Sequence, residues 1–169
     1  MADDAGQWTS VADQIAAAWR LTPSAPALEC EGARLSYAQL GARADALAHA
    51  LGALGAATDV PIAVCCARSP ALVVALLGVL RAGAGYVPLE PSHPPRRLRH
   101  MLVAARVAVA VVDAAGYDAL RPAEGDACGV AEDGDDALHS ALALVRVDAD
   151  GVVLLSLIHI SEPTRRTPI

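Results

Sequence analysis

The cysteines are the first candidates for chemistry, because thiolates act as nucleophiles, redox groups and metal ligands. Cys30, Cys65, Cys66 and Cys128 show no C-x-x-C spacing and have no histidine at ligand distance. Cys65 and Cys66 are adjacent within an apolar run, so their side chains are expected on opposite faces of a strand. We interpret the cysteines as small buried side chains of a protein from a reducing compartment.

The histidines and a glycine-rich turn give no stronger pattern. No spacing typical of a metal site or a general base links His49, His93, His100 and His139. Gly83 and Gly85 form a G-A-G turn, and such turns bind phosphate when they open a helix. Here the glycines follow a predicted helix and precede a predicted strand, which is the reverse of the dinucleotide-binding order. We therefore expect them to end the helix.

A short run of arginines, Arg96, Arg97 and Arg99, lies in the stretch "SHPPRRLRHML". It has two interpretations: a patch for phosphate or a carrier protein, or a solvated helix start with one arginine paired to a local carboxylate. The second is favoured, because exposed arginines are usually solvated. The sequence therefore predicts no catalytic, cofactor-binding or metal-binding residue within 1–169.

Composition excludes several classes of protein. Apolar residues make up 54% of the 169 positions, which suits one packed domain or part of a larger one. No apolar stretch reaches membrane-span length, and the start "MADDAGQW" lacks the basic and apolar regions of a signal peptide. The net charge is −6 and the chain has no long basic run, which argues against nucleic-acid binding. We expect a soluble cytoplasmic protein with no membrane or nucleic-acid partner.

Helix and strand patterns alternate along the chain. A helix is predicted at 9–21, a hairpin turning at Glu31-Gly32, and helices at 37–55, 70–83 and 95–105. Buried strands are predicted at 60–67, 85–91, 107–113 and 150–156, with an irregular solvated connection at 121–136. The β-α-β-α-β order predicts an α/β fold with a mostly parallel sheet and helices on both faces.

Several stretches resemble adenylation domains of non-ribosomal peptide synthetases, within the AMP-forming acyl- and aminoacyl-activating superfamily. The (L/T)-(T/S)-Y-x-(E/Q)-L motif is matched by 35–40, "LSYAQL". The (L/K/R)-A-G-x-x-Y-(V/L)-P-(L/I)-(D/E)-P motif is matched by 81–91, "RAGAGYVPLEP". A following P-x-x-R-(L/I)-x-x-(M/I)-L pattern is matched by Pro94, Arg97, Leu98, Met101 and Leu102. The motifs occur in order at family-like spacing, and together they span most of residues 8–113.

The resemblance implies a fold and a reaction. The fold is the incomplete N-terminal lobe of an adenylate-forming enzyme. In the reaction, the carboxylate of an amino acid or other carboxylic acid attacks the α-phosphate of ATP, with Mg²⁺, and gives an acyl-adenylate and pyrophosphate. The acyl group then passes to the phosphopantetheine thiol of a carrier-protein domain, and AMP leaves. The family's T-S-G-(S/T)-T-G-x-P-K-G phosphate loop is not found, and the sequence contains no lysine. We therefore expect residues 1–154 to be a truncated adenylation domain that is inactive and binds no cofactor.

Two alternatives remain open for the function of the chain. One is a fragment of an acyl- or aryl-CoA ligase of the same superfamily, although "GYVPLEPSHPPRRL" leans toward the peptide-synthetase branch. The other, from a different class, is an α/β binding module without catalysis.

The C-terminal residues differ in composition from the rest. Before this tail the chain has only Ile15 and Ile62, whereas the tail adds Ile158, Ile160 and Ile169. The string at 155–165, "LSLIHISEPTR", resembles the translation of a sequencing-library transposase adapter, and "RTPI" would then be index sequence. We therefore expect 155–169 to be a non-native tail and expect 156–169 to lack stable packing.

Overall fold

The computed structural model describes residues 10–121 and 142–159 of the chain. Its helices are α1 (Val11–Leu21), α2 (Tyr37–Ala53), α3 (Pro70–Arg81), α4 (Pro95–Ala104) and α5 (Ala114–Leu120). Its strands are β1 (Pro26–Cys30), β2 (Ala33–Ser36), β3 (Pro61–Cys65), β4 (Gly85–Leu89), β5 (Val109–Val112), β6 (Ala143–Val147) and β7 (Val153–His159).

Local sequence fixes the starts of the first two helices. The Ser10 hydroxyl accepts the Asp13 N–H at 3.1 Å, and the Asp13 carboxylate accepts the Ser10 N–H at 3.3 Å. The side chains of Ser36 and Gln39 make the same reciprocal pair at the start of α2. These are capping boxes, which satisfy N–H groups that a helix start leaves without partners. The S-x-x-D spacing at Ser10 and the S-x-x-Q spacing at Ser36 predict both caps, and the structure confirms them.

The hairpin of β1 and β2 turns at Glu31 and Gly32, as predicted. Their φ angles are 49° and 85°, so both central residues of the turn are left-handed. Two left-handed residues define the type I′ turn, whose twist matches that of the flanking antiparallel strands.

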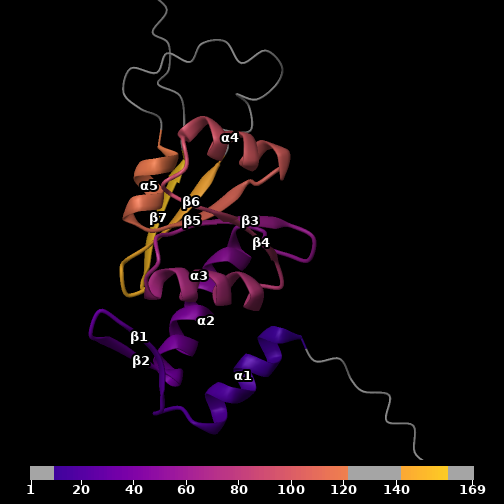
Figure 1. Cartoon of the computed structure of the whole chain (residues 1–169). Coiled ribbons are helices and arrows are strands. Elements are labelled where there is room, and N and C mark those ends of the chain that lie inside the picture. Colours follow the sequence, from indigo (N-terminus) through magenta and orange to yellow (C-terminus); the bar gives the residue numbers. More distant parts are fainter. Residues whose placement is uncertain (1–9, 122–141, 160–169) are drawn as a thin grey trace, which may run out of the picture.

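The main sheet has the strand order β4-β3-β5-β6-β7. The first four strands in this order are parallel to one another, and β7 is antiparallel to β6. Figure 1 shows α4 and α5 above this sheet and α3 and α2 below it, with α1 and the hairpin as a further layer. The predicted α/β fold with a mostly parallel sheet and helices on both faces is confirmed.

Two apolar clusters fill the spaces on either side of the sheet. Cys66 lies in the cluster between the sheet and helices α2 and α3. Cys65 lies in the cluster between the sheet and helices α4 and α5. The predicted opposite orientation of the two thiols is therefore confirmed, because adjacent residues of a strand point to opposite faces.

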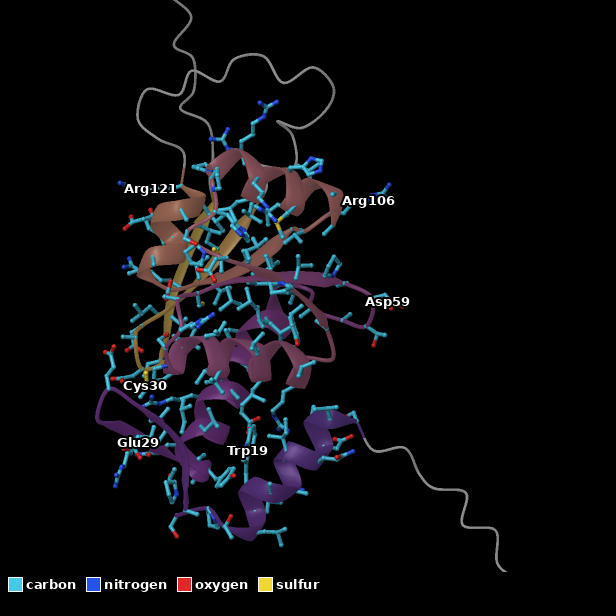
Figure 2. The ribbon with its side chains drawn as sticks, in the orientation of Figure 1. Trp19, Glu29, Cys30, Asp59, Arg106 and Arg121 are labelled. Carbon is cyan, nitrogen blue, oxygen red and sulfur yellow. The ribbon has the colours of Figure 1, made fainter. Side chains whose placement is uncertain are left out.

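The lower layer is anchored by Trp19 of α1, which packs against Ala44 of α2. The guanidinium of Arg81, at the end of α3, stacks over the Trp19 ring at 5.2 Å from its centroid and forms an ion pair with Asp45. Figure 2 shows Trp19 between α1 and the helices above it. One arginine thus links α1, α2 and α3.

Two elements are not predicted by the sequence patterns. Helix α5 has only seven residues, and β6 carries Arg146 within its apolar run. Both patterns are too short or too interrupted to indicate an element by periodicity alone. Most of the connection predicted at 121–136 lies outside the described residues.

The expectation that 156–169 lacks stable packing is wrong for the backbone of residues 156–159, which pairs within a strand. Strand β7 continues to His159, where Ile158 pairs with Leu144 and His159 pairs with Ala143 of β6. Backbone hydrogen bonds between strands do not require particular side chains, so a change of composition does not by itself end a strand. In the described part of the chain, no helix has the length and apolarity needed to cross a membrane.

Replacing Gly116 with alanine should strongly destabilise the fold. A Cβ atom at Gly116 would lie 1.7 Å from the carbonyl oxygen of Cys65, so the backbone of α5 or β3 would have to move. We expect a loss of about 3 kcal/mol in the free energy of unfolding, measured by urea denaturation.

Gly52→Ala is the matched control for this substitution. Gly52 lies in α2, and a Cβ atom there meets nothing within 4 Å. Alanine in a helix interior should therefore add about 0.5–1 kcal/mol of stability. Equal effects of the two substitutions would contradict the close contact between α5 and β3.

Candidate functional site

The carboxyl ends of the parallel strands form the edge where a ligand is best placed. From β3 the chain crosses through α3 to β4 on one side, and it returns through α4 to β5 on the other side. Because such crossovers are right-handed, the reversal places α3 and α4 on opposite faces of the sheet. The connections that follow β3 and β5 therefore leave in opposite directions. In open α/β sheets, ligands bind in the crevice that forms at such a point.

Asp113 holds this edge together. It directly follows β5, and it is the one buried charged residue in the described part of the chain. One carboxylate oxygen accepts the Ala67 N–H at 2.8 Å, and the other accepts the Gly116 N–H at 2.8 Å. The carboxylate therefore joins the connection after β3 to the first turn of α5, and backbone donors stabilise its charged form.

A hollow of about 280 Å³ opens at the same edge. Its walls come from the start of α3, the ends of β5 and β6, and β7; the lining residues are Ser69, Asp113, Ala114, Arg146, Val147, Asp148, Ala149 and Leu154. Asp148 turns its Oδ1 atom to the Asp150 and Val152 N–H groups, at 3.0 Å and 2.7 Å. Both acidic side chains of the hollow thus accept hydrogen bonds from backbone N–H groups.

The two thiols below this edge are not activated nucleophiles. Burial, and secondarily the negative charge of Asp113, raises the pKa of both Cys65 and Cys66 to about 12. A reactive cysteine needs a lowered pKa, because the thiolate is the attacking form. The interpretation of these residues as buried apolar side chains fits this environment.

The arginine and glycine candidates lie away from the hollow. Arg96 and Arg97 are exposed on α4, Arg99 is half-buried, and none of them lines the hollow. Gly83 follows α3 with φ 78°, and its N–H donates to the Leu80 carbonyl. That position is a helix C-terminus, as expected, and it lies at the opposite edge of the sheet.

The remaining histidines and cysteines form no cluster in residues 10–121 and 142–159. His49 and His100 are exposed on α2 and α4, and His93 is half-buried in the connection after β4. Within these ranges no three His, Cys, Asp or Glu side chains gather as a metal site would require. His139 and Cys128 lie outside the described residues.

Sequence reasoning does not identify the residues that surround the hollow. Ser69 directly precedes the helix predicted at 70–83, which marks it only as a helix start, and no sequence pattern groups Asp113, Arg146 and Asp148. They follow or end different strands and come together only when those strands pair. The available signal is positional, since polar residues just after buried parallel strands converge at one edge.

The sequence matches the family model described as AMP-binding enzyme over residues 15–165. The chain belongs to the AMP-binding enzyme family. The match covers most of the chain and includes both motifs quoted above. It also runs through residues 155–165, so it gives no support for a boundary at Leu155.

Individual relatives are peptide synthetases. The chain is 43% identical over 99 residues to a linear gramicidin synthase from Brevibacillus parabrevis, covering 59% of this chain and 1% of that protein. It is 39% identical over 131 residues to AMB antimetabolite synthetase AmbB from Pseudomonas aeruginosa, covering 78% of this chain and 10% of that protein. The resemblance to peptide-synthetase adenylation domains is thereby confirmed, for a chain that spans a tenth or less of either relative.

A solved structure supports the fold of this AMP-binding family member. The nonribosomal peptide synthetase FmoA3, in its AMPPNP-bound form, aligns with a TM-score of 0.67 and 24% identity. The alignment covers 82% of this chain and 13% of that chain. At this identity the likeness shows the fold alone.

The environment of Cys65 and Cys66 predicts slow alkylation. At pH 8 the native thiols should react with iodoacetamide about 10²–10³-fold more slowly than in urea, because very little thiolate is present. Peptide mapping by mass spectrometry measures both sites, and Cys30 on the hairpin, which is only half-buried, is the internal control (Figure 2). Native labelling of Cys66 as fast as in urea would refute the assignment.

The same groups predict a loss of stability at high pH. Folding raises the thiol pKa from 9.0 to about 12, so the folded state binds these protons more tightly. This contribution to stability is complete below pH 9 and is lost as the pH rises toward 12. Cys65→Ala combined with Cys66→Ala should flatten the fall in the urea midpoint between pH 9 and pH 11.

Proposed function

We propose that this chain is the N-terminal part of an adenylation domain that activates an amino acid for non-ribosomal peptide synthesis. The observation that carries the proposal is the family match over residues 15–165, together with peptide-synthetase relatives of about 40% identity. The family motif at 81–91 also supports the proposal. In the structure this stretch runs from the last residue of α3 through the whole of β4. We place the whole enzyme in the cytoplasm, with a carrier-protein domain as its acyl acceptor.

The AMP-binding family uses ATP and Mg²⁺, but the described residues are not suited to bind a nucleoside triphosphate. The hollow at the carboxyl edge presents the carboxylates of Asp113 and Asp148, which would repel the several negative charges of a triphosphate. It offers a single cation, Arg146, and the sequence contains no lysine. We therefore assign no step of the reaction to these residues.

The role proposed for the described part is structural support. The sheet and its two apolar clusters form a scaffold with defined loops at one edge. Stabilising the charge of a leaving pyrophosphate needs preorganised donors and cations held by such a scaffold. On this proposal, those groups are supplied by sequence that continues the domain.

The peptide-synthetase assignment has one main competitor within the family, a CoA ligase. The two differ in the acyl acceptor, which is a carrier-domain pantetheine in one case and free CoA in the other. A genomic reading frame that continues into a carrier domain favours the peptide-synthetase function. A frame that ends after the adenylating enzyme, with acyl transfer to CoA, favours the ligase.

The 169-residue polypeptide should form no acyl-adenylate. Removing one group that stabilises the developing charge commonly lowers a rate about 10²–10³-fold, and here neither a phosphate loop nor a lysine is available. Pyrophosphate exchange with panels of amino, aryl and fatty acids should stay at background. Acid-dependent exchange that copurifies with the chain would overturn this prediction.

The positive control for that experiment is a longer protein that includes the genomic continuation. With the genomic continuation joined after Leu154, we expect a T-S-G-(S/T)-T-G-type loop with a lysine and acid-dependent exchange. Replacing that lysine with alanine should return exchange to background. A continued chain that folds and binds ATP but remains inactive with every acid would favour a non-catalytic module.

We also propose that residues 155–169 derive from adapter sequence. A genomic read through the locus that departs from this sequence after about Leu154 would support this origin. An identical genomic sequence through Ile169 would exclude it.

The two parts of this tail should behave differently on deletion. Removing 160–169 should leave the melting temperature unchanged within error. Removing 156–169 should lower it, because the partners of β6 at Leu144 and Ala143 are lost. Equal melting temperatures for both deletions would contradict the pairing of β7 beyond Ser156.

A further inference from the structure

We infer that the hollow at the carboxyl edge binds a small oxyanion, a carboxylate or a phosphate, through the guanidinium of Arg146. The site differs from a nucleoside triphosphate site, because its rim also carries two carboxylates, whose charge disfavours a polyanion.

Arg146 occupies an unusual place for a charged side chain. It lies within β6, paired with Val112 of β5 on one side and with Leu154 of β7 on the other. It is two residues from Leu144, so both side chains point to the sheet face covered by α5. Arg146 is half-buried, and a cation that is partly withdrawn from water loses hydration and needs compensation.

The described protein supplies only part of that compensation. The Arg146 guanidinium lies over the Tyr117 ring of α5, 5.3 Å from its centroid. Its Nε atom is buried and has no hydrogen-bond partner among the described residues. The ring offers no lone pair to the guanidinium N–H groups, which are the groups that an oxyanion binds.

The nearby carboxylates do not fill this role. The two oxygens of Asp113 accept the Ala67 and Gly116 N–H groups, and Oδ1 of Asp148 accepts two N–H groups of its own loop. Among the described residues, neither carboxylate forms an ion pair with Arg146. They hold the loops that shape the hollow, and their charge favours a ligand of low charge over a polyanion.

The start of α3 provides a second feature that favours an anion. Ser69 is the N-cap of this twelve-residue helix and lines the hollow, but its side chain makes no capping hydrogen bond. Its hydroxyl instead donates to the Ala67 carbonyl at 3.3 Å, a long bond that is easily exchanged. The helix dipole adds positive potential at this end.

The volume sets the size of the ligand. A hollow of about 280 Å³ admits a carboxylic acid of several heavy atoms or a single phosphate group. A ligand with a hydrogen-bond donor near its anionic group would also meet the remaining lone pairs of Asp148. The inferred class is therefore a small monoanionic acid or inorganic phosphate.

The test is a titration of thermal stability at constant ionic strength. Sodium chloride is replaced stepwise by sodium acetate in one series and by sodium phosphate in the other. We expect the melting temperature of the wild-type chain to rise and saturate with at least one of the two anions. A response to acetate alone assigns a carboxylate ligand, and a response to phosphate alone assigns a phosphate ligand.

Arg146→Met and Arg97→Met form the matched pair of variants. Arg97 is an exposed arginine outside the hollow, so its variant should respond like the wild type. Arg146→Met should bind the responding anion at least about tenfold more weakly, because a charge-assisted hydrogen bond is lost. Without added anion this variant should melt at or above the wild-type temperature, since an incompletely paired cation is replaced by an apolar side chain.

A second measurement follows the site directly. The Arg146 Nε–H resonance, assigned by its absence in Arg146→Met, should shift in ¹H–¹⁵N spectra with the same saturation curve as the melting temperature. The inference is overturned if neither anion stabilises more than chloride does. It is also overturned if Arg146→Met folds and responds like the wild type.

Discussion

The fold depends on the contact between the end of β3 and the first turn of α5. The backbone at Gly116 lies so close to the Cys65 carbonyl that no Cβ atom fits, and Asp113 binds the N–H groups of both Ala67 and Gly116. This contact fixes the connection after β3 relative to the helix after β5. Helix α3 begins at Pro70, so the same contact holds the stretch of chain that leads into that helix.

Burying a carboxylate costs hydration free energy, and the surroundings of Asp113 explain how this cost is met. Hydrogen bonds from backbone N–H groups offset the hydration that the carboxylate loses on burial. A neutral apolar residue would not need such compensation. The charge in turn raises the pKa of the neighbouring thiols, adding to the effect of burial. Asp113 therefore shapes the edge geometrically, and its charge adds to the larger effect of burial, which keeps Cys65 and Cys66 protonated.

Much of the scaffold could be predicted from the sequence because its information is local. Capping boxes, a two-residue hairpin turn and uninterrupted apolar runs each specify an element within a few residues. Helix α5 and strand β6 could not be predicted in this way. The seven residues of α5 are stabilised by the Asp113 cap and by packing at Gly116, and the apolar pattern of β6 is broken by Arg146. Tertiary contacts decide both.

The same distinction explains why the candidate site could not be found from sequence patterns. Those patterns emphasise charges that are adjacent in the chain, such as Arg96 and Arg97, which the fold leaves exposed on α4. The polar residues of the hollow are single, widely spaced positions that become neighbours only because β5 and β6 pair in parallel register. Arg146 illustrates the point, because the feature that hides β6 from a periodicity argument is the cation through which the edge would bind a ligand. A charged residue that interrupts a buried strand near its carboxyl end is therefore better treated as a candidate site residue than as evidence against the strand.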